Sequence, residues 1–234
     1  MTAPANKHGD GADKSVRITG ARRVLLHGFD PYTDTAITQR HLPHWTQPGA
    51  TYFITFRLGD SIPLDLQRQW QAEREAWLRH HPEPWEATVE AEYHARFTRE
   101  QDEWLDAGMG ECHLRRRDIR SQVEMNLAHF NGQRHDLDAY VLMPNHVHAL
   151  LIPRDGQSVF ELLKGIKGVS ARWCNQLLDR TGETFWMEDS YNRIVRDAEE
   201  LWAKRRYIEQ NPTIARLRPD EFTLVMNEAL YVEP

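Results

Sequence analysis

The segment from residue 136 to residue 152 constrains the fold of this chain most strongly. It contains two stretches typical of β-strands, DLDAYVLM at 136–143 and NHVHALLI at 145–152. Pro144 and Asn145 lie between the two apolar runs, and this pair of residues is typical of a tight turn. The segment therefore predicts an antiparallel hairpin, around which the other elements must be arranged.

The other elements follow from hydrophobic period and from capping residues. The stretch TYFITFRL, which begins at Thr51, alternates β-branched and aromatic residues as a strand does, and a short strand is expected at 191–195. Ser158 and Asp197 are expected to cap two of the helices. The expected helices are 63–107 with a break near Pro82 and Pro84, 114–130, 158–180 and 198–211, closed by Pro212.

This order of elements is that of a ferredoxin-like α+β fold, in which an antiparallel sheet carries helices on one face. The helices at about 63–112 would be an insertion in the first crossover. We expect a partly disordered leader at 1–40, a main domain at 41–212 and a tail at 213–234.

The charge of the chain is unevenly distributed. The formal net charge is −6, but the segment 65–111 alone has 12 acidic and 5 basic residues. The rest of the chain is therefore close to neutral, and a polyanionic partner is not excluded. Only two cysteines are present and no apolar run reaches the roughly 18–20 residues of a membrane span, so a cytoplasmic protein is expected.

Two histidines on the second strand of the hairpin form a candidate metal site. His146 and His148 are two residues apart, so their imidazoles point to the same face of the sheet while Val147 points to the other. Paired imidazoles are common metal ligands. On the spacing alone, two partly exposed strand histidines that bind nothing are the favoured interpretation.

Tyr207 and Asn211 form a second candidate pair on the last helix. They are four residues apart and share one helix face. The tyrosine offers a nucleophilic hydroxyl and the asparagine an oxygen ligand. The alternative is a boundary tyrosine and an asparagine that merely ends the helix.

Basic side chains offer candidate contacts to a phosphate backbone. Arg115, Arg116, Arg117 and Arg120 form the densest cluster, and Lys204, Arg205 and Arg206 directly precede Tyr207. Lys164 and Lys167 lie one turn apart beside small residues, although a solvated helix face explains them equally well. On the other side of that helix a buried face is expected, made of Val159, Leu162, Ile166, Val169, Trp173 and Leu177.

Several motifs together resemble a known family. MPNHVHALL at 143–151 resembles the metal strand of the HUH superfamily of single-strand DNA nucleases. SYNRIVRDAEEL followed by RRYIEQNP resembles the C-terminal signature of REP-associated tyrosine transposases, and LLKGIKGVSARW resembles their lysine-bearing helix. HLPHW and YFITFRL fit their N-terminal strand region. The likeness covers about 41–58 and 136–212, and leaves out the acidic insertion.

The resemblance implies a role for each candidate residue. His146, His148 and Asn211 match the three metal ligands, for Mg²⁺ or Mn²⁺, and Tyr207 matches the nucleophile, with Tyr191 as a rival. The implied activity is cleavage and rejoining of single-stranded DNA through a 5′-phosphotyrosine. The implied partner is a hairpin of the repetitive extragenic palindrome (REP) type, bound by a monomer or homodimer associated with the nucleoid.

Two other functions are compatible with the same residues. One is a regulator without catalytic activity that has this fold and binds hairpin DNA. The other is a metal-dependent hydrolase that uses the histidine pair with a carboxylate such as Asp155 or Glu188.

Overall fold

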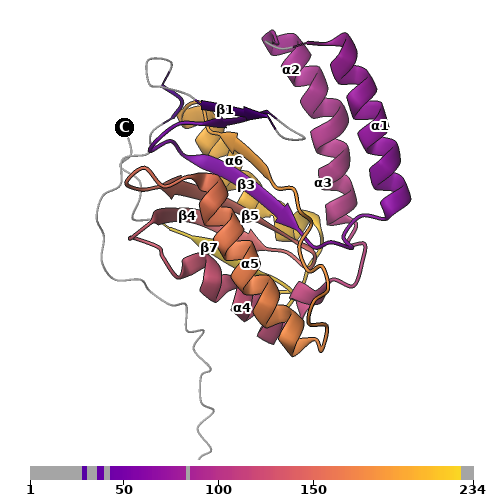
Figure 1. Cartoon of the computed structure of the whole chain (residues 1–234), viewed down its shortest axis with the longest axis vertical. Helices are drawn as coiled ribbons and strands as arrows, with labels where there is room; N and C mark the ends of the chain where they lie inside the picture. Colours follow the sequence, from indigo (N-terminus) through magenta and orange to yellow (C-terminus); the bar gives the residue numbers. More distant parts are fainter. Residues whose placement is uncertain (1–27, 31–35, 40–42, 83–84, 228–234) are drawn as a thin grey trace, which may run out of the picture.

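The structure, a computed structural model, describes residues 28–30, 36–39, 43–82 and 85–227. Its centre is a five-stranded antiparallel sheet with strand order β6-β3-β5-β4-β7, seen in Figure 1. The strands are β3 (Tyr52–Arg57), β4 (His135–Leu142), β5 (His146–Pro153), β6 (Tyr191–Ile194) and β7 (Thr223–Met226). A separate hairpin of β1 (Ala36–Gln39) and β2 (Pro43–Thr46) precedes them. The α+β fold with an antiparallel sheet is therefore confirmed.

The predicted hairpin is present as β4 and β5. Its turn is closed by a hydrogen bond of 2.8 Å from Met143 N to the His146 carbonyl. All eight residues of β5 are buried, because β3 and β4 flank the strand and helices cover both faces of the sheet.

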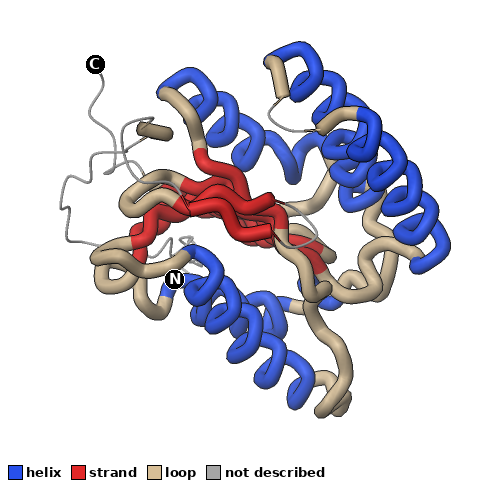
Figure 2. Tube along the Cα trace, turned by 45° about the horizontal axis from the view of Figure 1, so that its top comes forward, coloured by secondary structure: helices blue, strands red, loops and turns tan. Residues whose placement is uncertain are grey.

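Helices pack on both faces of the sheet, which corrects the expectation of one helical face. The helices α4 (Arg117–Ala128) and α5 (Val159–Leu177) cover one face, and α6 (Ala198–Ile214) packs on β4 and β5 from the other; Figure 2 shows the sheet between these layers. The physical reason lies in the strands, which are apolar on both sides. Val147 and Leu151 belong to the core under α4 and α5, whereas Leu150 belongs to the core under α6.

Both predicted helix caps are present. Ser158 Oγ accepts a hydrogen bond from Phe160 N, and the Asp197 side chain accepts one from Glu200 N at 2.8 Å. Helix α6 continues to Ile214, so that Pro212 lies in its last turn instead of ending it.

The buried face of α5 differs from the predicted one in its second half. Val169, Trp173 and Leu177 are 48%, 50% and 43% exposed. The buried face continues instead through Ser170 and Cys174. Ser170 accepts a hydrogen bond from the Trp186 indole at 2.9 Å, so small residues lie where the helix meets its neighbours.

The acidic segment forms helices beside the sheet, as expected for an insertion (Figure 1). They are α1 (Leu64–His80), α2 (Ala87–Tyr93), a π-helical turn (His94–Thr98) and α3 (Arg99–Asp106). The predicted break between helices is present. Trp77, Tyr93 and Phe97 form a small core of their own, against which Trp70 and Trp85 pack.

The fifth strand comes from the segment that was expected to be a tail. β7 pairs with β4 at the sheet edge, and Arg120 connects it to α4. The Arg120 guanidinium is buried and donates to the Leu114 and Asp220 carbonyls, both at 2.8 Å, and to Thr223 Oγ1 at 3.0 Å. Arg120 therefore does not belong to the basic surface, as the sequence had suggested. Most of the expected leader, and the tail beyond residue 227, lie outside the described residues.

None of the described helices is both long and apolar enough to span a membrane.

Candidate active site

Two buried histidines lie side by side on β5, on the face of the sheet that α6 covers. His146 and His148 are 0% and 1% exposed, and their ring centroids are 4.6 Å apart. Val147 between them belongs to the core on the opposite face. The alternation of a strand has therefore brought the two imidazoles together.

Each imidazole is held through its Nδ1 atom. His148 Nδ1 lies 2.7 Å from Thr55 Oγ1 on β3, and His146 Nδ1 lies 2.8 Å from Asn145 Oδ1. The Asn145 amide is oriented by a hydrogen bond of 3.0 Å from its Nδ2 to the Met109 carbonyl. Because an amide oxygen can only accept, His146 Nδ1 donates and its Nε2 carries a free lone pair. The same tautomer at His148 lets Nδ1 donate to Thr55.

Burial keeps both imidazoles neutral. Desolvation lowers the pKa of His146 from its ordinary 6.5 to about 3. Desolvation also lowers the pKa of His148 well below 6.5, and the charges of His146 and Lys204 lower it further. A neutral imidazole with a free nitrogen lone pair is the form that binds a metal ion.

Helix α6 brings Tyr207 to this pair. Tyr207 Oη lies 3.4 Å from His148 Nε2, and the two rings meet edge to face with centroids 5.0 Å apart. The Phe53 ring stacks on His148 at 5.6 Å and contacts Tyr207 with its centroid 5.9 Å away. The phenol is thus packed among rings beside the histidines.

Polar atoms at this site are buried without hydrogen bonds. No described atom bonds to His146 Nε2, nor to Oδ1 or Nδ2 of Asn211, which is 0% exposed. Asn211 is close enough to Tyr207 to lower the pKa of the phenol, but it makes no hydrogen bond of good geometry. Buried polar groups are normally satisfied. Two imidazole nitrogens and an amide oxygen suit a divalent metal ion, so the residues present fit the metal that the resemblance implies.

The phenol of Tyr207 lies in a charged environment. Burial raises the pKa of Tyr207 above its ordinary 10, and the nearby Asp102 and Asp106 raise it further. Lys204 supplies the opposite charge, with its Nζ 4.5 Å from the centre of the Phe53 ring and 5.9 Å from that of the Tyr207 ring.

Four polar residues of this site were not identified from the sequence: Thr55, Asn145, Asp102 and Asp106. Asn145 directly precedes His146, and this adjacency was the available signal. Thr55 becomes a partner only through the pairing of β3 with β5. Nothing in the sequence distinguishes Asp102 and Asp106 from the other ten carboxylates of the acidic segment.

The rival nucleophile, Tyr191, lies on the edge strand β6. It is paired in register with Thr55, and so lies two strands away from His148. Burial raises the pKa of its hydroxyl to about 12. Tyr207 is the tyrosine whose hydroxyl approaches the histidine pair.

Arg205 does not lie where a phosphate contact was expected. It is 7% exposed and donates to Asp138 Oδ1 of β4. A buried guanidinium already paired with a carboxylate is not available to DNA, so this expectation is corrected. The adjacent Arg206 is exposed.

The other basic candidates lie at the surface. Arg115, Arg116 and Arg117 are exposed near the β4–β5 turn, since Leu114 N donates to the Pro144 carbonyl. Arg115 and Arg116 pair with Glu221 and Asp118 at 3.5 Å and 2.7 Å.

The two lysines of α5 differ from each other, and both are on the helix layer away from the histidines. Lys164 is exposed, whereas Lys167 donates to the Glu188 carbonyl at 2.7 Å and to Ser190 Oγ at 2.9 Å. Lys167 therefore holds the loop that leads into β6.

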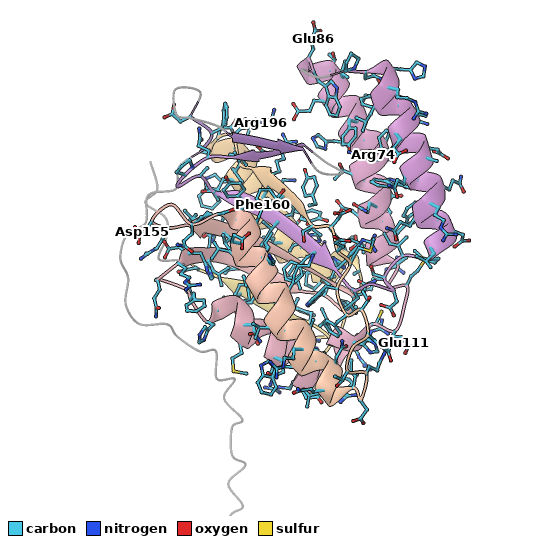
Figure 3. The ribbon with its side chains drawn as sticks, in the orientation of Figure 1. Arg74, Glu86, Glu111, Asp155, Phe160 and Arg196 are labelled. Carbon is cyan, nitrogen blue, oxygen red and sulfur yellow. The ribbon has the colours of Figure 1, made fainter. Side chains whose placement is uncertain are left out.

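The carboxylates considered for a hydrolase are not gathered at the histidines. Asp155 is exposed in the turn beyond the far end of β5, a strand that extends roughly 23 Å from His146 to Pro153; Figure 3 shows Asp155 across the molecule from Glu111. Glu188 is exposed in the loop before β6. The residues that the structure describes contain no group of three His, Cys, Asp or Glu side chains that could hold a metal ion.

Comparison with known proteins found a matching family model and similar solved structures. The sequence model of the family described as "Transposase IS200 like" matches residues 115–211. A solved REP-associated tyrosine transposase bound to a REP hairpin is similar at 13% identity and a TM-score of 0.40, over 81% of this chain and 74% of that one. A protein of Deinococcus radiodurans R1, provisionally assigned as a transposase, is similar at 15% identity and a TM-score of 0.33, over 80% of this chain and 98% of that one. No curated protein matches the sequence.

The family match includes all four residues of the buried site, His146, His148, Tyr207 and Asn211. Residues 115–211 of the chain are therefore similar to the IS200-like transposases.

Proposed function

We propose that this protein cleaves and rejoins single-stranded DNA with Tyr207 as the nucleophile, through a 5′-phosphotyrosine intermediate. One observation carries the proposal: within the segment similar to transposases, the Tyr207 hydroxyl lies 3.4 Å from Nε2 of His148, beside buried polar atoms of His146 and Asn211 that have no hydrogen bond among the described residues. A nucleophile next to metal-binding groups is what metal-assisted phosphoryl transfer to a protein side chain requires.

His146, His148 and Asn211 would hold the divalent ion, Mg²⁺ or Mn²⁺. When bound, the ion supplies charge that polarises a phosphate oxygen. Thr55 and Asn145 orient the two imidazoles through their Nδ1 atoms, which presents both Nε2 lone pairs to one place. Residues of this kind, which hold the ligands rather than the ion, strongly affect metal affinity.

In the transfer step, Tyr207 is the nucleophile and Lys204 is the nearby positive charge. The Tyr207 oxygen forms a bond to phosphorus while the bond from phosphorus to the 3′ oxygen breaks. The phenol loses one proton and the leaving 3′ oxygen gains one, so the step is balanced. Lys204 lies against the phenol ring and favours the developing negative charge. The new ester retains the energy of the phosphodiester, so a second 3′-hydroxyl can reverse the step and join strands.

The expected substrate is hairpin DNA of the REP type, by the resemblance of the sequence motifs. Among the basic side chains, Lys164 and Arg117 are exposed and suited to phosphate contacts, as are Arg115 and Arg116 beside the β4–β5 turn. Lys167 would contribute to DNA binding indirectly, by holding the loop that leads into β6. We treat 41–212 as the transposase domain with the acidic insertion at about 63–112, to which β7 adds a strand.

The test is the formation of a covalent adduct. The full-length protein is incubated with Mn²⁺ and a pool of single-stranded DNA hairpins with randomised single-stranded flanks, labelled 3′ of the cleavage site. We expect a labelled protein–DNA adduct that resists denaturation and that Tyr207→Phe abolishes. Tyr191→Phe is the matched control and should form the adduct.

Each other outcome would support a different nucleophile or a different function for this protein. An adduct that survives Tyr207→Phe but is lost in Tyr191→Phe would assign the nucleophile to Tyr191. Cleaved DNA without an adduct would favour a hydrolase. Binding of the hairpins with neither product would favour the regulator without catalytic activity.

A further inference from the structure

A cavity of about 100 Å³ lies between the inserted helices and the sheet. Its lining comes from α1 and α3 of the insertion, from β3 and from the segment that leads into β6. Thr55, whose Oγ1 lies 2.7 Å from His148 Nδ1, is part of this lining, so the cavity adjoins the histidine pair. Asp189 also lines it and is exposed, so the cavity reaches the surface. A single water needs only about 10–15 Å³, and the cavity therefore has room for a chemical group of a ligand.

The guanidinium of Arg57 is a buried positive charge in the lining of this cavity. Arg57 is 7% exposed. Its Nη1 donates to Ser61 Oγ at 3.1 Å, and the guanidinium forms no other hydrogen bond and no ion pair within the part of the chain that the structure describes. Burial lowers the pKa of Arg57 from 12.5 to about 10, while the charge of Asp189 raises it. Arg57 is therefore positively charged at neutral pH.

The other buried arginines of the described chain have more compensation. Arg205 pairs with a carboxylate of β4, and Arg120 donates to two carbonyls and a hydroxyl. Arg74, which also lines the cavity and is labelled in Figure 3, donates from Nε to Tyr93 Oη at 2.6 Å. A buried charge costs free energy unless an opposite charge or several hydrogen bonds compensate it. An anion in the cavity would supply this compensation for Arg57.

The pairing of β3 with β5 places Arg57 next to the candidate metal ligands. Arg57 is in register with His146, and Thr55 is in register with His148. Residues two apart on a strand share a face, so Arg57 lies on the same face of the sheet as Thr55 and the two imidazoles. Neighbouring strands are about 4.8 Å apart. A DNA strand with one phosphate at the histidines therefore has its next phosphate within reach of the cavity.

Gln67 of α1 gives a second sign that the cavity takes a polar group. It lines the cavity, and its buried Oε1 has no hydrogen-bond partner among the described residues. Buried polar groups are normally satisfied. A half-turn of the amide exchanges Oε1 for Nε2, so the same side chain can donate to an anion.

We propose that this cavity binds a phosphate of the DNA strand next to the phosphate that Tyr207 attacks, with the Arg57 guanidinium as its counter-charge. The inference rests on the proposed function. A guanidinium suits a phosphate because its N–H groups can donate in pairs to the phosphate oxygens. Since α1 and α3 form one side of the cavity, the acidic insertion becomes part of the DNA-binding site.

The experiment measures DNA binding without metal, so that its result does not depend on cleavage. The affinity of the full-length protein for hairpins with all-thymine or all-adenine single-stranded flanks is measured in EDTA over a range of salt concentrations. We expect Arg57→Met to weaken binding by roughly 10- to 100-fold. The slope of log affinity against log salt concentration should become shallower by about 0.7, the effect of one phosphate contact in a single strand. Both hairpins should lose the same affinity, because a phosphate carries no base identity.

Three further variants are compared with Arg57→Met. Arg68→Met is the matched control, since Arg68 is exposed on α1 outside the cavity lining, and it should leave the affinity and the salt slope nearly unchanged. Arg57→Lys retains the charge without the planar group and should recover part of the affinity. Asp189→Asn removes a carboxylate that repels phosphate, so it should strengthen binding by about two- to fivefold.

The melting temperature distinguishes a binding role of Arg57 from a structural one. Arg57→Met should melt at or above the wild-type temperature, because an apolar chain replaces a buried charge that has little compensation. A variant that melts well below the wild type would give Arg57 a structural role and overturn the inference.

Other results would also overturn it. They are an unchanged affinity or salt slope in Arg57→Met, an equal loss in Arg68→Met, a loss that differs between the two flanks, weaker binding in Asp189→Asn, and no binding of either hairpin by the wild-type protein. A wild-type protein that binds the hairpins but forms no adduct with Mn²⁺ is a different result. It rejects Tyr207 as a nucleophile, while the affinities of the variants still decide whether the cavity binds phosphate.

Discussion

The histidine pair has its metal-binding form because of the residues behind it. Thr55 and Asn145 each occupy an Nδ1 atom, which leaves each Nε2 without a proton and able to offer its lone pair. Burial removes the competing protonated form. These features belong to the tertiary structure of the site and not to the His-Val-His sequence alone.

Thr55 offers a direct test of this arrangement. Thr55→Val preserves the shape of the side chain but removes the hydrogen-bond partner of His148, so we expect the affinity for Mn²⁺ to fall by about 10- to 100-fold. The dissociation constant is measured by titration calorimetry.

Thr51→Val is the control for that substitution. Thr51 is also buried, but its Oγ1 has no hydrogen-bond partner within the described residues, so metal affinity should not change. Equal affinities for all three proteins would contradict the orienting role of Thr55.

Asp102 predicts a pH dependence of stability. Burial raises its folded-state pKa from 3.8 to about 7, so the unfolded chain releases this proton first as pH rises. The folded state is therefore destabilised by Asp102 between about pH 4 and pH 7, by at most about 1.4 kcal/mol per pH unit. Asp102→Asn should gain stability relative to the wild type as pH rises through this window.

Urea unfolding at pH 4.5 and pH 7.5 measures this difference. Glu103→Gln, at an exposed position of the same helix, should show a difference from the wild type that does not vary with pH. A difference for Asp102→Asn that is also constant would show that its carboxyl titrates normally.

At the level of elements, the position of α6 decides whether an active site exists. The helix must pack on the histidine face, opposite to α4 and α5, to bring Tyr207 to His148. The pair formed by Arg205 and Asp138 connects α6 to β4, with side chains that are 9% and 0% exposed. This pair is therefore a structural contact at the base of the site.

Removing one partner of that pair should be costly. We expect Arg205→Ala to lower the free energy of unfolding by about 3–5 kcal/mol, because the Asp138 carboxylate remains buried without its counter-charge. Equilibrium unfolding in urea measures the change. The exposed neighbour Arg206→Ala is the control and should cost little, and a similar small loss in both variants would refute the structural role of Arg205.

At the scale of the whole molecule, two separately packed parts meet at one site. The sheet and its helices carry the histidines and the tyrosine, and the insertion has an aromatic core of its own. The insertion contacts the site through the Met109 carbonyl, which orients Asn145, and the charges of Asp102 and Asp106 raise the pKa of Tyr207. The acidity of the chain is therefore concentrated in the part that orients Asn145 and acts on Tyr207 through its charge.

Metal binding should stabilise the whole fold, since the site is assembled only in the folded chain. Mn²⁺ at about 100 times its dissociation constant should add about 2.7 kcal/mol, which corresponds to a rise in Tm of roughly 5–10 °C. Differential scanning calorimetry measures the shift. His146→Ala should lose the shift, whereas His129→Ala, at an exposed position, should retain it. An undiminished shift in His146→Ala would place the ion elsewhere.

The local pattern of the sequence determined the hairpin, the shared face of His146 and His148, the two helix caps and the break within the insertion. Each depends on spacing over a few residues, which sets side-chain direction and backbone hydrogen bonding directly. The motifs around His146 and Tyr207 also indicated a transposase, and the model of the IS200-like transposases matches residues 115–211, which contain both motifs.

Only the tertiary structure decided which face α6 covers, that Arg205 is buried, that the second half of α5 turns Trp173 outward, and that the charges of Asp102 and Asp106 act on Tyr207. These contacts join residues that are far apart in the chain. Amphipathic spacing predicts that one face of a helix is buried, but it does not predict which other element that face packs against. The strands are apolar on both sides, so the sequence pattern favoured neither face for the closing helix. The packing of α6 against the sheet therefore determines which face of the sheet the helix covers.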